Sequence, residues 1–86
     1  MRKSIYTAQY ETFLEVLRAR RERAGVTQVE LAKRLGSTQS QISKCERGER
    51  RLDVIELRRW CEAIDDTLAA LVRDLEKRLG GGKRKR

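Results

Sequence analysis

The sequence is short of several residue types, and each shortage narrows the classes of protein it can belong to. Its 86 residues include no histidine, no proline, two cysteines and only 5% aromatic residues. With no histidine, and with Cys45 and Cys61 outside any Cys-x-x-Cys pair, the chain lacks the ligand sets typical of zinc. It also lacks a recognisable carboxylate pair and a glycine-rich phosphate loop after a strand. We therefore expect no enzyme activity, no metal and no cofactor.

Long apolar segments are missing too. No stretch approaches the roughly 18 apolar residues of a membrane-spanning helix, and the start of the chain lacks the apolar core of a signal peptide. We expect a soluble, cytoplasmic protein with no membrane partner. Cys45 and Cys61 both fall on apolar positions of predicted helices, which indicates small buried side chains in a reducing cytosol; a redox role is the alternative.

The chain is rich in charge and in helix-forming residues. Charged residues make up 40% of it and apolar residues 38%, with no strand-like run of Val, Ile and Thr. This composition and length predict a single all-α domain. The net charge is +8, and four of the positive charges lie in residues 83–86. The excess favours a polyanionic partner, although an ordinary solvated surface is the alternative.

Helix start and stop signals divide the chain into five predicted helices. Thr27 with Glu30, Thr38 with Gln41 and Asp53 with Glu56 have the spacing of N-terminal capping residues, and glycines follow several of the apolar periodic runs. The predicted order is an arm over residues 1–7, helices over 8–24, 28–35, 39–47, 54–64 and 67–79, and a disordered basic tail over 80–86.

The helix predicted over residues 39–47 has little to bury. Only Ile42 and Cys45 are apolar, and they share one narrow face, whereas Ser40, Lys44 and Arg47 gather on the opposite side of the helical wheel. A helix anchored along one edge is suited to lie against a polar, anionic surface.

Residues 17–64 resemble, without gaps, the helix-turn-helix domain of the Xre and phage repressor and Cro family. The resemblance implies a five-helix DNA-binding domain with the helix-turn-helix over residues 28–47, and a bacterial or phage origin. Two positions depart from the family pattern, since Leu52 stands where proline is common and Asp65 where glycine is common. The matching residues are Thr27-Gln28, Glu30-Leu31-Ala32, Gly36, Gln39-Ser40, Ile42-Ser43, Glu46-x-Gly48, Leu57 and Ala63-Ile64.

The resemblance also implies a role for individual residues. Gln39, Ser40 and Lys44 match the part of the recognition helix that reads base edges, and their chemistry agrees, because Gln pairs with adenine and Lys with guanine acceptors. Glu46 matches an acid that pairs with an arginine of the first helix, here Arg21, in a structural ion pair. The residues expected to contact phosphates are Gln28, Thr38, Ser43, Arg47, Arg50 and Arg51.

The last predicted helix carries an apolar stripe longer than one domain core requires. We expect Leu68 and Leu71 to serve the core, and Val72, Leu75 and Leu79 to form a homodimer interface. Folding of the whole helix onto its own domain is the alternative.

Together these features predict a sequence-specific double-stranded DNA-binding regulator, most simply a repressor that binds a palindromic operator as a homodimer. The alternatives are the antitoxin of a toxin and antitoxin pair, with a toxin as protein partner, and a restriction-modification controller protein. We expect no effector domain and no ligand pocket in so short a chain.

Overall fold

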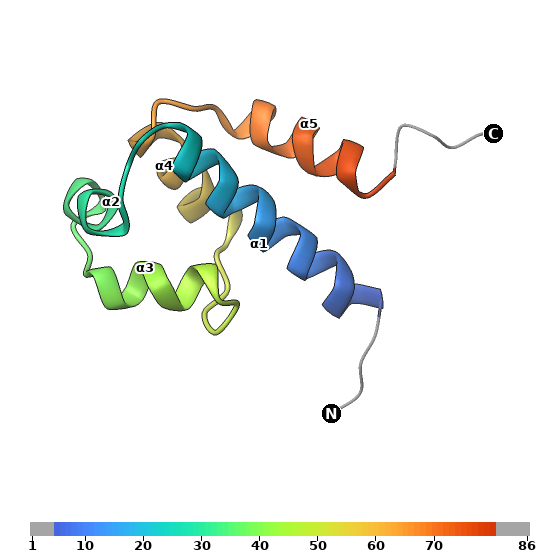
Figure 1. Cartoon of the computed structure of the whole chain (residues 1–86), viewed down its shortest axis with the longest axis horizontal. Helices are drawn as coiled ribbons and strands as arrows, with labels where there is room; N and C mark the ends of the chain where they lie inside the picture. Colours follow the sequence, from blue (N-terminus) through green and yellow to red (C-terminus); the bar gives the residue numbers. More distant parts are fainter. Residues whose placement is uncertain (1–4, 81–86) are drawn as a thin grey trace.

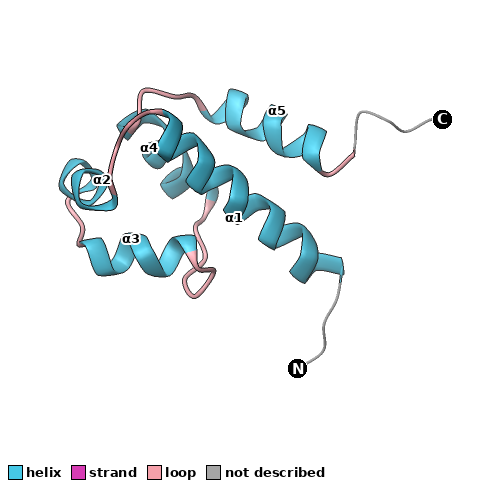
Figure 2. Cartoon of the chain, in the orientation of Figure 1, coloured by secondary structure: helices cyan, strands magenta, loops and turns pink. Residues whose placement is uncertain are grey.

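The structure, a computed structural model, describes residues 5–80. In this range the chain forms five helices and no strand, which confirms the all-α prediction (Figures 1 and 2). The helices are α1 Ile5–Arg23, α2 Gln28–Leu35, α3 Gln39–Glu46, α4 Val54–Ala63 and α5 Leu68–Arg78.

Capping residues set the start of four of these helices. Thr27 and Asp53 each form a complete capping box, while the Thr38 and Thr67 hydroxyls accept a hydrogen bond from the third helical amide. Gly36 ends α2 in the left-handed conformation, with φ 67°. These are the signals that the sequence displayed, and they explain why predicted and observed starts agree so closely.

The largest boundary difference is at the start of α1, and several other helix ends differ from the prediction by one residue. Helix α1 begins at Ile5, before the predicted start at Ala8, so only residues 1–4 of the predicted arm remain, and they lie outside the described residues. Helix α3 ends at Glu46, with Arg47 as its C-cap. Of the predicted tail over 80–86, residues 81–86 also lie outside the described residues.

One core joins all five helices. Trp60 and Cys61 of α4, Leu31 of α2, Leu17 of α1 and Leu71 of α5 are all at least 99% buried. Ile42 and Cys45 attach α3 to the same cluster. Both cysteines are free and buried.

Helix α1 lies between α3, which carries the candidate base-reading residues, and α5, which carries the candidate dimer residues. It packs against α3 on one side and against α5 on the other, and α2 packs against α3 and α4 (Figure 1). Arg20 fixes the α5 side, because its guanidinium donates to Asp66 in the α4–α5 connection and to Asp74 in α5. Because α1 packs against both helices, α3 and α5 lie on opposite sides of it (Figure 1).

Candidate nucleic-acid interface

Helix α3 presents a polar face to solvent. Ile42 and Cys45 are buried, whereas the base-reading candidates Gln39, Ser40 and Lys44 are all exposed. The structure therefore places these three side chains on the accessible side of a helix that is anchored along its other edge. Such a helix can enter a groove without giving up contacts to its own domain.

A buried ion pair holds α3 against α1. Arg21 Nε donates to Glu46 Oε2 at 2.6 Å and Arg21 Nη2 donates to Glu46 Oε1 at 3.0 Å. The remaining guanidinium nitrogen, Arg21 Nη1, donates to the Val26 carbonyl at 2.9 Å. Arg21 is 7% exposed and Glu46 is 9% exposed. The two residues expected to pair are thus brought together, in a bidentate geometry that fixes orientation as well as distance.

A chain of amides extends this pair to the exposed face. Gln28 Nε2 donates to Glu46 Oε1 at 2.9 Å, and Gln39 Nε2 donates to Gln28 Oε1 at 2.8 Å. Gln28 and Gln39 each stand at the first position of a helix, so a short turn brings them close together. From the sequence, Gln28 was expected to contact a phosphate and Gln39 a base, and their spacing along the chain does not indicate this link. The hydrogen bond to Gln28 therefore restrains the side-chain amide of Gln39, while the Gln39 side-chain carbonyl oxygen has no partner among the described residues.

The arginines that follow α3 already have intramolecular partners. Arg47 donates to Ser43 and to both carboxylate oxygens of Glu49. Arg50 donates to Glu56 at 2.8 Å. Because these groups are exposed, a phosphate must compete with a carboxylate for each guanidinium, and exposed pairs of this kind are weak.

Arg51 is held differently, by stacking. Its guanidinium carbon lies 4.2 Å above the Tyr10 ring centroid of α1. Stacking uses the face of the guanidinium and leaves its in-plane N–H donors available. The loop itself is pressed against α1 at Gly48, where an added Cβ would lie 2.9 Å from Leu14 Cδ1. The backbone there also has φ 81°, so this approach requires glycine.

The remaining phosphate candidate, Thr38, is the N-cap of α3, and its hydroxyl accepts from the Gln41 amide. It is exposed and stands beside the free amides of the helix N-terminus, where anions are favoured.

Helix α5 keeps part of its apolar stripe on the surface. Val72 is 46% exposed and Leu79 is 37% exposed, while Leu71 is fully buried. Leu75 is half-buried and packs against the core, so it serves its own domain as well as any partner.

The structure also bears on other kinds of site. No three His, Cys, Asp or Glu side chains among the described residues are grouped to hold a metal ion. None of the described helices combines the length and apolar character needed to span a membrane. Burial raises the pKa of the Cys61 thiol to about 11, as expected for an inert core cysteine. A cavity of about 290 Å³ lies between α3 and α4, and the expected absence of a ligand pocket stays a prediction.

Comparison with known proteins identifies the family. The HTH_3 family model, described as helix-turn-helix, matches residues 17–71. The solved structure of an XRE-family like protein from Pseudomonas syringae pv. tomato str. DC3000 shares 48% sequence identity and superposes with a TM-score of 0.79, over 85% of this chain and 89% of that one. No curated protein gives a significant match. The chain belongs to the XRE family of helix-turn-helix proteins, and it is a DNA-binding transcription regulator of that type.

Proposed function

We propose that the protein is a cytoplasmic repressor that binds a palindromic operator as a homodimer. The observation that carries this proposal is the construction of α3, a short helix with an exposed polar face that is locked to α1 by the buried Arg21 and Glu46 pair. A rigid recognition helix loses little conformational freedom when it binds.

Gln39, Ser40 and Lys44 read base edges in the major groove. Gln39 is restrained by Gln28, so its free carbonyl oxygen faces the DNA in a fixed direction. Lys44 supplies a donor for guanine acceptors, and Ser40 between them is small enough to let the helix approach closely.

Phosphate contacts on both sides of α3 set its register on the duplex. Gln28 and Thr38 act from the helix N-termini, where free amides and the helix dipole favour anions. Ser43, Arg47, Arg50 and Arg51 act from the other end, where Arg51 has the most accessible donors because it is stacked on Tyr10.

A homodimer formed through α5 supplies the second half-site. The exposed Val72 and Leu79 provide its apolar seam, with Leu75 at the edge of the core. Two copies related by a two-fold axis match a palindrome whose half-sites are about 10 base pairs apart. The contacts of both copies together discriminate the operator from non-specific DNA. Repression follows when the bound dimer covers a promoter.

Selection of bound sites from random DNA duplexes tests this proposal. The expected result is an inverted repeat with its half-sites about one helical turn apart. Recovery of sequences with no shared motif, or of a single half-site without a repeat, would contradict it.

A further inference from the structure

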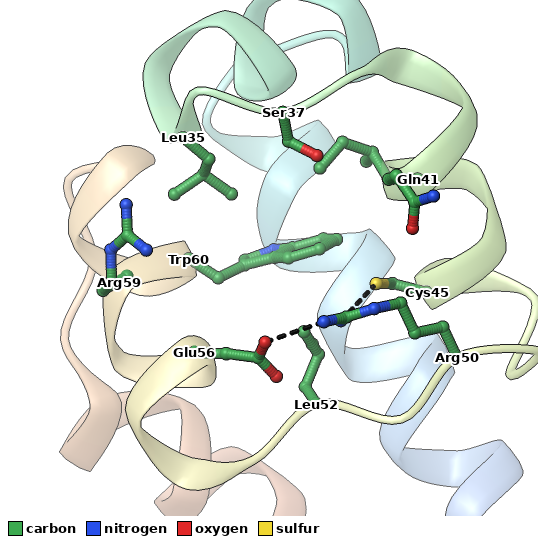
Figure 3. A pocket seen from close by; sticks show the side chains of 10 residues that line it. Leu35, Ser37, Gln41, Cys45, Arg50, Leu52, Glu56, Arg59 and Trp60 are labelled. Carbon is green, nitrogen blue, oxygen red and sulfur yellow. Dashed lines mark hydrogen bonds and ion pairs between the residues drawn. The ribbon is translucent and has the colours of Figure 1, made fainter.

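The cavity between α3 and α4 lies directly behind the recognition helix. Its volume is about 290 Å³, close to the lower limit for small-molecule sites. Apolar side chains from α2, α3, the following loop and α4 form its inner wall, and Trp60 extends across it (Figure 3). The apolar lining residues are Leu35, Ile42, Cys45, Leu52 and Trp60.

The mouth of the cavity carries an excess of positive charge. Arg50 and Arg59 stand on opposite sides of it in Figure 3, with Glu56 as the acidic residue of the lining. Glu56 is fully engaged, because one of its oxygens accepts from Arg50 at 2.8 Å and the other from the Asp53 amide at 2.9 Å. Arg59 makes no hydrogen bond or ion pair with another described residue. Arg50 and, to a smaller extent, the charge of Arg59 lower the pKa of Glu56, but the Arg59 N–H donors have no hydrogen-bond acceptor among the described residues and can receive an anion.

Arg50 lies across the cavity. Besides its bond to Glu56, it donates from Nη1 to the Cys45 Sγ at 3.7 Å, so it links the recognition helix to α4 (Figure 3). Both contacts are exposed or partly buried, and both are weak enough for a ligand to replace. Ser37 and Gln41 add neutral hydrogen-bonding groups on the α3 side of the mouth.

We propose that this cavity binds a small organic anion, with an apolar body against Leu35 and Leu52, above the buried Trp60, and a carboxylate between Arg59 and Arg50. A body of about ten heavy atoms suits the volume, and the carboxylate matches a guanidinium in shape and charge. A neutral molecule of the same shape leaves Arg59 without a partner and binds less well.

Binding of such an anion also regulates DNA binding, and this second step rests on the function proposed above. Arg50 cannot hold the ligand carboxylate and a DNA phosphate at the same time. The ligand also contacts Gln41 and Cys45 of α3, so it acts on the helix that reads the bases. The anion therefore weakens operator binding.

Tryptophan fluorescence tests the site without DNA, because Trp60 is the only tryptophan in the chain. The probes are benzoate and hexanoate, with benzamide and hexanamide as neutral controls. We expect a saturable change with at least one anion, with a dissociation constant on the order of 1 mM, and a weaker response to the matching amide. If neither anion gives a saturable change, or if each amide acts as well as its anion, the site does not exist.

A pair of variants tests the position of the carboxylate. Arg59→Gln should weaken anion binding about fivefold, whereas Arg58→Gln, which alters a neighbouring arginine outside the cavity lining, should leave it unchanged. Equal affinity in Arg59→Gln and wild type would overturn the assignment. Thermal melts check that both variants are folded.

The effect of the anion on DNA binding is measured separately, as a change in operator affinity. The responding anion should raise the dissociation constant for a selected operator in wild type, and raise it less in Arg59→Gln. If Trp60 responds but operator affinity does not change, the site stands and regulation through it is wrong. If the protein binds no DNA, the proposed function is wrong, but the fluorescence result still shows whether the cavity binds the anion.

Discussion

Asp65 has a backbone conformation that its own side chain disfavours. Its φ is 58°, and among residues 5–80 it is the one residue other than glycine with positive φ. The family often has glycine here, and glycine adopts this region without a steric cost. Because aspartate stands at this position in place of glycine, the turn between α4 and α5 is strained at Asp65.

Replacing Asp65 with glycine should stabilise the protein. We expect Asp65→Gly to raise the free energy of unfolding by about 0.5–1 kcal/mol, since relief of the left-handed strain exceeds the entropy that glycine adds to the unfolded chain. Urea unfolding measures the change. Asp65→Ala, which keeps a Cβ and loses the polar side chain, should be no more stable than wild type. A less stable Asp65→Gly variant would mean that the carboxylate itself favours the turn.

Glu46 should be among the most sensitive polar residues, because its removal leaves Arg21 buried without its anionic partner. We expect Glu46→Ala to lower the free energy of unfolding by about 3 kcal/mol. Glu49→Ala, which breaks the exposed pair with Arg47, is the control and should have no measurable effect. If the melting curves of both variants overlay that of wild type, the buried pair has no structural role.

Asp66 gives the fold a defined sensitivity to acid. Hydrogen bonds from Arg20 hold the pKa of Asp66 below its usual range. Its folded pKa is thus lower than its unfolded pKa of about 4, so the pair stabilises the protein above that pH and this stability is lost as the pH falls through the folded pKa. Asp66→Asn should be less stable at neutral pH and should show a smaller loss on acidification. Parallel stability curves for the two proteins would show that the pair contributes nothing.

At the scale of elements, helix starts were predictable because they depend on neighbouring residues. Thr27, Thr38 and Asp53 cap the helices they were expected to cap. The start of α1 was not, since the segment before Tyr10 has no clear apolar period. The contact between Gln28 and Gln39, and the cavity behind α3, also escaped prediction. Both depend on how two helices pack, which spacing along one chain does not specify.

The outer face of α5 offers a direct test of the proposed dimer. Val72 is exposed in the single chain, so Val72→Glu should leave the monomer stable while placing a charge in the apolar seam. We expect sedimentation to show a wild-type dimer at micromolar concentration and a monomeric variant.

The matched control for this experiment is Val54→Glu, which alters an even more exposed valine on α4. It should sediment as wild type does. Loss of the dimer in Val54→Glu with retention in Val72→Glu would move the interface to α4, and a monomeric wild type would remove it. Leu75→Glu is less informative, because Leu75 also packs in its own core.

For the molecule as a whole, the two candidate surfaces are well separated. Helix α1 lies between α3 and α5, so a copy bound along α5 does not cover the residues proposed to read DNA (Figure 1). The net charge of +8 favours approach to a polyanion from any direction, but charge alone does not select a sequence. Selectivity must come from the few exposed polar residues of α3.

The most direct test of base reading by α3 is the affinity of Lys44→Ala for its selected site and for a shuffled duplex at the same salt concentration. Lys44 is exposed and is not part of the core cluster, so the variant should fold normally. We expect a loss of about 1–3 kcal/mol on the selected site, a much smaller loss on the shuffled one, and relaxed preference at one base position. An equal loss on both duplexes would show that Lys44 contacts only phosphate and would contradict the claim that α3 reads bases through this residue.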